Sequence, residues 1–238
     1  MGQDGKDGVL FASYNIHKCV GSDRRFDPAR IAAVIAEIDA DVIALQEADR
    51  RFGDREGLLD LDALRARTGL APVPVANGHL GHGWHGNLLL LRGGRVRRVR
   101  QVTLPGLEPR GALLADLELA SGPVRVVGMH LGLLRQSRLR QVDTLLGHAA
   151  EAETIPTVLM GDMNEWRRER RSALGGFAAG FAGPGVPSFP AYYPMLALDR
   201  IFARPGHILG RIEVHDSPLA RRASDHLPVK ARIALRRH

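Results

Sequence analysis

The amino-acid sequence predicts a mixed α/β sandwich, in which two β-sheets pack against each other and helices cover their outer faces. Short runs rich in β-branched residues or leucine recur along the chain with turn residues between them. A few amphipathic stretches are interleaved with these runs. No repeat of fixed period and no linker rich in proline, serine or glycine divides the apolar sequence. We therefore expect residues 1–238 to form one domain.

The predicted strands are short apolar runs bounded by glycine, proline or polar turn residues. Ser121-Gly122, between two of these runs, is typical of a β-hairpin turn. The predicted strands are Val9–Tyr14, Asp41–Leu45, Pro72–Ala76, Gly86–Leu91, Val96–Leu104, Ala112–Leu119, Val124–Met129, Pro156–Met160, Arg200–Ala203, Gly210–Val214 and Leu227–Leu235.

The first predicted helix has the strongest signals. Asp27 is a suitable N-cap, and Pro28 fits the first helical position because its ring fixes φ and no N–H is needed there. Apolar residues then recur on one helical face: Ile31, Val34, Ile35 and Ile38.

Two more helices and one irregular segment complete the predicted elements. A helix is expected from Asp60 to Thr68, ending at Gly69. Another is expected over Ser137–Ala149, with its arginines facing water. Its predicted apolar face consists of Leu139, Val142, Leu145, Leu146 and Ala149. The glycine- and proline-rich stretch Gly175–Pro190 is expected to be a surface excursion.

Composition excludes several classes of protein. Hydrophobic residues make up 45% and charged residues 25%, which is typical of a soluble globular domain. The single cysteine, Cys19, allows neither an internal disulfide nor a zinc site built from thiolates. The longest unbroken aliphatic run, Leu88–Leu91, is too short to span a bilayer, and Met1–Gly8 lacks the apolar core of a signal peptide. We expect a soluble, cytoplasmic monomer.

The net charge of +7 has two interpretations. It favours a phosphate-rich partner, but every basic residue except Lys6, Lys18 and Lys230 is arginine, so a coding bias explains it equally well. Aromatic residues make up only 5%, so the sequence has no obvious stacking platform for single-stranded nucleic acid.

Several predicted strands end in, or closely follow, a carboxylate, an amide or an imidazole. Because strand ends meet at a sheet edge, these groups can converge although they are far apart in the sequence. The set consists of Asn15, Glu47, His130, Asp162, Asn164, Asp199, Asp225 and His226. Taken singly, each residue is more often a turn cap, a loop charge or a structural histidine.

Convergence of four carboxylates requires a counter-charge, because each ionised group raises the pKa of its neighbours. A divalent cation supplies that charge, and hard oxygen ligands favour Mg²⁺ or Mn²⁺ over zinc. Such an ion suits hydrolysis of a phosphoester, since it neutralises charge on the phosphoryl oxygens.

The ordered motifs of the chain resemble those of the endonuclease/exonuclease/phosphatase superfamily. The resemblance spans residues 9 to 229 and implies a four-layer α/β/β/α sandwich with its site at one edge of the paired sheets. It also implies a phosphoester hydrolase, since the superfamily includes DNase I-like nucleases, sphingomyelinases and inositol polyphosphate phosphatases. The motifs are Ser-Tyr-Asn15, Leu-Gln-Glu47, Gly-Asn87, Gly-Met-His130-Leu, Gly-Asp162-Met-Asn164, Leu-Asp199-Arg-Ile-Phe and Ser-Asp225-His226-Leu-Pro-Val.

By this resemblance, Glu47 is the principal metal ligand, assisted by Asn15 and Asp225. Asp162 orients or deprotonates the attacking water, and Asn164 holds water or a phosphoryl oxygen. Whether Asp162 or His226 is the general base stays open.

The resemblance assigns the histidines to the phosphate. His130 contacts the phosphate and assists the leaving oxygen. Asp225 pairs with His226 and fixes its tautomer, while Asp199 positions one of the histidines or joins the metal ligands.

Three further residues are candidates for substrate contacts. Asn87 matches a position near the cleft or caps the following strand. Arg110 matches a phosphate-contacting arginine of DNase I-like members, and its planar fork of donors suits a phosphate. His17 is either an added site residue or a loop histidine. With His130 where abasic-site endonucleases carry a tyrosine, the chain is nearer to the DNase I and sphingomyelinase members.

The leading prediction is a Mg²⁺- or Mn²⁺-dependent phosphodiesterase that acts on nucleic acid. Arg50-Arg51 and the segment 167–171 flank the motifs and would attract a phosphate backbone. Trp166 with these arginines would equally suit lipid headgroups, so a phospholipid or small-metabolite esterase is the first alternative. A catalytically silent polyanion-binding module is the second, and the intact polar set argues against it.

Overall fold

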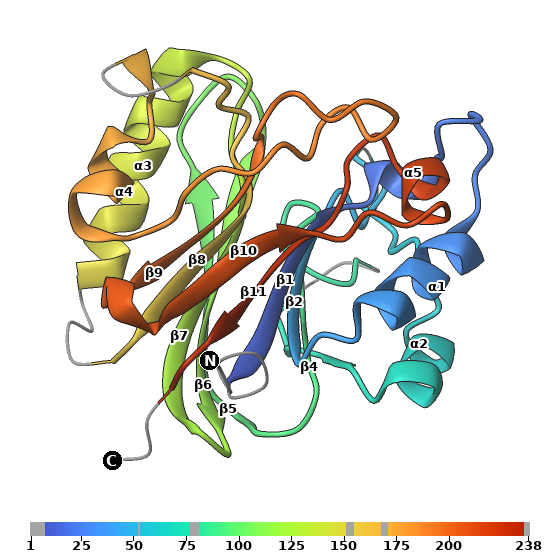
Figure 1. Ribbon diagram of the computed structural model, residues 1–238, viewed down its shortest axis with the longest axis horizontal. Helices are drawn as coiled ribbons and strands as arrows, with labels where there is room; N and C mark the ends of the chain where they lie inside the picture. Colours follow the sequence, from blue (N-terminus) through green and yellow to red (C-terminus); the bar gives the residue numbers. More distant parts are fainter. Residues whose placement is uncertain (1–7, 52, 77–80, 151–154, 168–170, 236–238) are drawn as a thin grey trace, which may run out of the picture.

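The protein is described from a computed structural model that covers residues 8–51, 53–76, 81–150, 155–167 and 171–235. Two mixed sheets lie face to face (Figure 1). The first sheet has the order β10-β11-β1-β2-β4-β3, with β1 Val9–Asn15, β2 Val42–Gln46, β3 Ala71–Pro72, β4 Leu88–Leu91, β10 Leu209–Val214 and β11 Val229–Ile233. The second has the order β5-β6-β7-β8-β9, with β5 Arg95–Leu104, β6 Arg110–Leu119, β7 Gly122–His130, β8 Thr157–Asp162 and β9 Asp199–Arg204.

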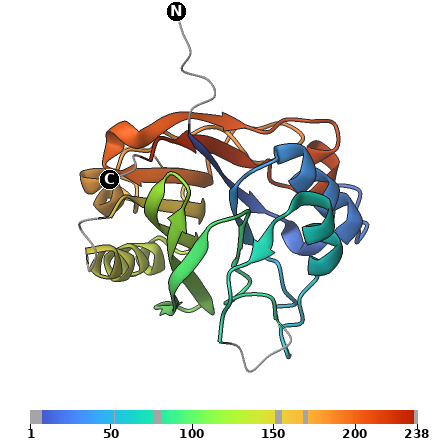
Figure 2. The ribbon, with the colours of Figure 1, turned by 90° about the horizontal axis from the view of Figure 1, so that it is seen from below.

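Helices cover the outer face of each sheet. Figure 2 shows α1 and α2 on one side of the molecule and α3 on the other, with the strands between them. The first group is α1 Pro28–Ile38, α2 Leu61–Thr68 and α5 Ala220–Ala223; the second is α3 Arg135–Ala150 and α4 Gly175–Gly180. Two 3₁₀ turns, η1 His17–Cys19 and η3 Gly206–Ile208, complete the elements. None of the helices within the described part of the chain is long and apolar enough to cross a membrane.

Three hydrophobic cores separate the four layers. Successive residues of a strand point to opposite faces of its sheet. Phe11 of β1 therefore packs between the sheets with Leu113 and Val126, whereas Tyr14 packs with Ile31 and Ile35 of α1. A third core joins the second sheet to α3 and α4 through Met129, Val142, Leu145, Leu159 and Phe177. The predicted four-layer α/β/β/α sandwich is confirmed.

The helix boundaries follow the capping residues identified in the sequence. The Asp27 carboxylate accepts a hydrogen bond from the N–H of Arg30 (2.9 Å), and Pro28 is the first helical residue of α1. Asp60 caps α2 in the same way, and Gly69, with φ of 73°, ends it in the left-handed conformation. The predicted first and second helices are confirmed.

Several predicted elements were wrong in extent. The last strand, predicted over Leu227–Leu235, is Val229–Ile233, and the strand predicted over Gly86–Leu91 is Leu88–Leu91. The strand predicted over Pro72–Ala76 is only Ala71–Pro72, followed by one more hydrogen bond to β4 from the N–H of Val73 to the carbonyl of Leu89 (2.9 Å). It ends there because Asn87, which would face Val75 in a longer ladder, pairs with Trp84 instead. The hairpin turn consists of Ala120 and Ser121 rather than Ser121-Gly122, since Leu119 pairs with Gly122.

Two predictions of exposure were also wrong. The stretch Gly175–Pro190 is not merely a surface excursion, because it contains α4 and buries Phe177 completely against α3. The arginines of the third helix do not all face water. Arg138 is fully buried, and its guanidinium lies 3.4 Å from the carboxylate of Glu165. No local pattern indicates this ion pair, since its two residues lie 27 positions apart in the chain.

Candidate active site

The second sheet places three candidate residues in one row. The register pairs His130 of β7 with Asp162 of β8, and Asp162 with Asp199 of β9. Residues paired across neighbouring strands project their side chains from the same face. Gly161 precedes Asp162 because a Cβ at that position would collide with the carbonyl oxygen of Met129. Tight pairing of β7 with β8 therefore brings His130 next to Asp162.

The first sheet supplies the opposite side of the site. Asn15 ends β1 beside Gln46 of β2, so Glu47 leaves the sheet next to Asn15. Glu47 has a φ of 57°, which is uncommon for a residue other than glycine and is typical of functional sites. Ser224 holds the last segment here, since its hydroxyl donates to the carbonyl of Asn15 (2.7 Å) and accepts from the N–H of His226 (3.2 Å).

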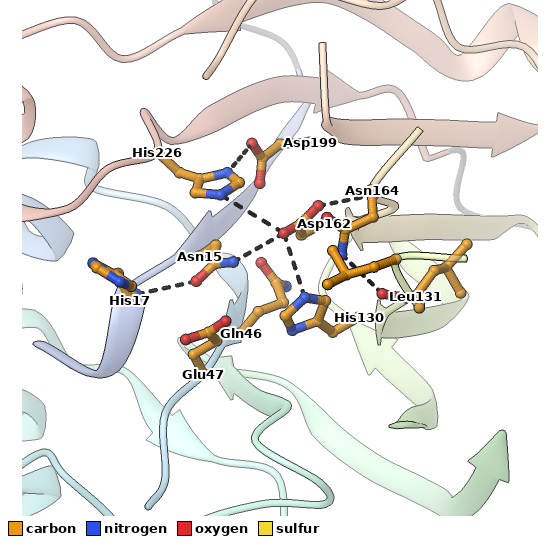
Figure 3. A network of polar contacts seen from close by, with 12 residues as sticks. Asn15, His17, Gln46, Glu47, His130, Leu131, Asp162, Asn164, Asp199 and His226 are labelled. Carbon is orange, nitrogen blue, oxygen red and sulfur yellow. Dashed lines mark hydrogen bonds and ion pairs between the residues drawn. The ribbon is translucent and has the colours of Figure 1, made fainter. Parts of the chain in front are cut away.

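Asp162 lies at the centre of the polar network between the sheets (Figure 3). Its Oδ2 accepts a hydrogen bond from Nδ2 of Asn15 (2.9 Å), and its Oδ1 accepts one from the N–H of Asn164 (2.9 Å). The Nε2 atoms of His130 and His226 lie 3.4 and 3.8 Å from the same Oδ2. Groups from both sheets therefore converge on one buried carboxylate.

The second imidazole is held by Asp199 and not by Asp225. His226 Nδ1 lies 2.8 Å from Asp199 Oδ2, and that oxygen also accepts a hydrogen bond from the hydroxyl of Ser188 (2.6 Å). Asp225 instead lies 3.6 Å from Nδ1 of His17, on the more exposed side of the site. The predicted pairing of Asp225 with His226 was wrong, because the bend before β11 directs the His226 ring to Asp199 of β9 and the Asp225 carboxylate to His17.

The two imidazoles have opposite charge preferences. Burial lowers the pKa of His130 to about 3, so this ring is neutral at pH 7 despite the nearby Asp162. Burial also disfavours the charged form of His226. The carboxylates of Asp199 and Asp162 outweigh that effect and raise its pKa to about 10. At neutral pH the site thus presents one neutral and one positively charged imidazole.

Glu47 and Asn15 form an oxygen-rich position at the mouth of the site (Figure 3). Glu47 Oε2 lies 2.5 Å from Nζ of Lys18, so this carboxylate already attracts a cation. The donor set therefore fits a hard divalent ion.

A second, buried group consists of Asp162, Asp199 and His226, whose ligand atoms lie within 4.8 Å of one another. Most of its polar atoms are used in the hydrogen bonds given above, although Asp199 Oδ1 has no hydrogen-bond partner within the described residues. We favour Glu47 and Asn15 as the position for an ion, because the Glu47 carboxylate is partly exposed, although Asn15 Oδ1 already accepts a hydrogen bond from the N–H of His17 (3.0 Å).

The candidates for substrate contact differ in their surroundings. Arg110 lines a pocket with Lys18, Glu47 and His130, and Glu108 fixes its guanidinium at 2.7 Å. Asn87 is buried and donates to backbone carbonyls of Trp84 and Gly111. These contacts hold the chain at the start of β4, as expected if Asn87 caps that strand.

Asn164 and His17 have backbone contacts. Asn164 Nδ2 donates to the carbonyl of Leu131 (2.9 Å), which joins the loop after β8 to the end of β7. His17 Nδ1 lies 3.0 Å from the carbonyl of Val20 at the exposed end of the site.

Sequence reasoning missed Lys18 and Ser188. Lys18 follows the Asn15 motif within a turn in which His17, Lys18 and Cys19 all have positive φ, and that proximity was the only available signal. Ser188 lies in the glycine- and proline-rich stretch, where nothing in the sequence indicates its contact with Asp199. Of the arginine segments, Arg50 and Arg51 lie near Glu56 and Glu108, while residues 168–170 lie outside the described residues.

Replacement of His226 by glutamine is expected to lower turnover of a phosphodiester by roughly 10²-fold or more, the usual range for an acid–base group. The amide keeps a donor toward Asp199, so we expect the melting temperature to change little. The measurement is steady-state kinetics beside a thermal melt, with His207→Gln, on the exposed turn η3, as the control. Loss of activity in step with loss of folding would instead assign His226 a structural role.

The comparisons with known proteins agree with this fold. The family model described as "Endonuclease/Exonuclease/phosphatase family" matches residues 12–226. The uncharacterized protein YbhP of Escherichia coli strain K12 is 27% identical over 252 residues, covering 93% of this chain and 94% of its own.

Two solved structures resemble the fold at low identity. Mannosyl-6-phosphatase Bt3783 of Bacteroides thetaiotaomicron VPI-5482 aligns with a TM-score of 0.74 and 17% identity, over 94% of this chain and 99% of its own. D. rerio TDP2, complexed with a single-strand DNA product, aligns with a TM-score of 0.68 and 17% identity, over 94% of this chain and 97% of its own.

Proposed function

Because the chain belongs to the endonuclease/exonuclease/phosphatase family, whose members hydrolyse phosphoesters, we propose that it is a divalent-metal-dependent phosphodiesterase. The observation that supports this proposal most strongly is the convergence of polar groups from both sheets on Asp162. These groups are Asn15, His130, Asn164 and His226. A fold with this arrangement has the parts needed for an in-line attack of water on phosphorus.

We assign the roles from the contacts. Asp162 orients the attacking water and accepts its proton, since it is the carboxylate on which the network converges. His226, held by Asp199, donates a hydrogen bond to a phosphoryl oxygen. His130, at the end of β7, donates a second one. Glu47 and Asn15 would hold Mg²⁺ or Mn²⁺, which would supply positive charge to the phosphoryl oxygens.

The substrate class is a further proposal. The sequence favours nucleic acid because of its positive charge, and TDP2 was solved with a DNA product. Bt3783, by contrast, is a mannosyl-6-phosphatase, so likeness of fold is compatible with a monoester as well. The silent-module alternative is less well supported, because six groups of the predicted network contact one another: Asn15, His130, Asp162, Asn164, Asp199 and His226. Glu47 contacts Lys18, and Asp225 lies beside His17.

The reaction class is tested with soluble bis-p-nitrophenyl phosphate in the presence of Mn²⁺ or Mg²⁺. We expect turnover that EDTA abolishes and that added metal restores. The panel also contains p-nitrophenyl phosphate, plasmid DNA and RNA, which separates monoesters and nucleic acids from other diesters. A folded protein that binds metal but hydrolyses no ester would contradict the proposal.

Replacement of Glu47 by glutamine is expected to weaken Mn²⁺ binding at least tenfold, because the variant loses a charged oxygen ligand. Isothermal calorimetry measures this directly, without reference to turnover. Glu56→Gln, at an exposed position of the following loop, is the control and should bind Mn²⁺ as the wild type does. Equal affinities in all three proteins would remove Glu47 from the metal site.

A further inference from the structure

The exposed large hydrophobic side chains are distributed unevenly over the molecule. Within the described residues there are eight of them, with 48–86% of their surface exposed. All eight lie in loops and none lies on a helix or strand. They are Phe26, Leu107, Leu133, Leu134, Trp166, Tyr192, Tyr193 and Met195, and we call them the apolar rim.

Each of these loops emerges at the sheet edge that carries the site. Phe26 follows β1, residues 133 and 134 follow β7, and Trp166 follows β8, three strands that end in site residues. Residues 192–195 precede β9 and Leu107 precedes β6, and both strands run antiparallel to a strand that ends at this edge. Figure 1 shows these loops along the upper end of the two sheets. The apolar rim therefore surrounds the candidate active site.

The fold does not need these side chains, because the three cores are complete without them. Isolated exposed apolar residues are normal on a soluble protein. Confinement of all eight side chains to the loops around one site is unusual, and it is typical of a surface that contacts a partner.

The charges next to the apolar rim indicate an anionic partner. Exposed arginines directly adjoin it in sequence: Arg25 next to Phe26, Arg135 next to Leu134, and Arg167 next to Trp166. The Arg167 guanidinium lies 5.7 Å from the centre of the Trp166 ring. Arginine beside tryptophan, tyrosine and leucine is the composition of surfaces that enter the headgroup region of a bilayer.

The aliphatic members distinguish a lipid surface from nucleic acid. Single strands bind through bases that stack on aromatic rings. Leu107, Leu133, Leu134 and Met195 have no ring, whereas acyl chains accept aliphatic side chains readily. In addition, Trp166 and Met195 line a cavity of about 480 Å³ together with Arg167 and Arg200, which combines apolar walls with positive charge.

We propose that the apolar rim docks on an anionic phospholipid surface and presents the phosphodiester of a lipid headgroup to the site. This inference rests on the proposed phosphodiesterase function and names its substrate class. Docking places the rim side chains at the level of the headgroups, where the arginines meet lipid phosphates.

Vesicle flotation tests the docking itself. The wild-type protein should float with vesicles of phosphatidylcholine and phosphatidylglycerol, and less with phosphatidylcholine alone. Leu133→Ser/Leu134→Ser should weaken binding at least tenfold while hydrolysis of soluble bis-p-nitrophenyl phosphate stays unchanged, since neither side chain belongs to the site. Arg211→Ser, exposed on β10 and outside the rim loops, is the control and should bind as the wild type does.

The outcomes separate this inference from the proposed function. Hydrolysis of the soluble diester without vesicle binding would overturn the docking and leave the phosphodiesterase intact. Vesicle binding with no hydrolysis of any ester would contradict the phosphodiesterase. If the wild type binds plasmid DNA but not vesicles, and the double serine variant no longer binds the DNA, the apolar rim would be assigned to nucleic acid. A wild-type dimer in sedimentation equilibrium that the double variant converts to monomer would assign it to a second copy of the chain.

Discussion

Replacement of Asp162 by asparagine is expected to lower turnover of bis-p-nitrophenyl phosphate by roughly 10²–10⁴-fold, the range for loss of an acid–base group. The amide has nearly the same shape but cannot accept a proton from water. It also removes the negative charge that lies within 4 Å of both imidazoles. Steady-state kinetics at saturating Mn²⁺ measures the effect, and calorimetry shows whether metal binding is retained.

A matched control separates this effect from a general loss of charge. Asp143→Asn changes the same functional group on the exposed face of α3 and should leave turnover unchanged. Turnover of Asp162→Asn within about twofold of wild type would exclude Asp162 as the group that activates water. The role would then pass to another carboxylate of the network.

Replacement of Arg138 by methionine is expected to lower the free energy of unfolding by about 3–5 kcal/mol, the usual result when one partner of a buried ion pair is removed. Glu165 is completely buried and would lose the guanidinium that faces its carboxylate. Arg138 also donates to the carbonyl oxygens of Gly132 (3.0 Å) and Leu133 (2.6 Å), so the loop after β7 loses two hydrogen bonds. Chemical denaturation with fluorescence of the tryptophans measures the change.

A double-mutant cycle tests whether the pair is the cause. Glu165→Gln should also destabilise the protein, and the double variant should lose less than the sum of the two single losses. The control is Arg221→Met, which breaks a solvent-exposed pair with Asp216 and should leave the denaturation midpoint almost unchanged. Additive losses in the cycle would show that Arg138 and Glu165 stabilise the protein independently.

The sequence predicted the fold because its signals are local. Asp27 with Pro28 and Asp60 with Gly69 are caps whose geometry depends on a few neighbouring residues, and both helices form where these signals predict them. The four layers follow from strand alternation and from amphipathic helices. The strand prediction over Pro72–Ala76 was wrong because Asn87, which would face Val75 in a longer ladder with β4, pairs with Trp84, and the pattern of the segment itself does not contain that contact.

The sequence also indicated most residues of the candidate site, because polar groups at strand ends are recognisable one motif at a time. It left their pairing undetermined. His226 contacts Asp199 rather than Asp225 because of the way the segment before β11 packs against β9 of the other sheet. No local sequence pattern predicts that packing.

The sequence by itself therefore determined the layers, the strand ends and the types of polar group that they carry. Only the tertiary structure decided that Asp162 is the common partner, that Arg138 is buried against Glu165, and that the exposed apolar side chains surround one sheet edge. The physical reason is the range of the interactions. Capping and strand alternation act between neighbours in the chain, whereas these contacts join residues whose separation is fixed only when the two sheets pack.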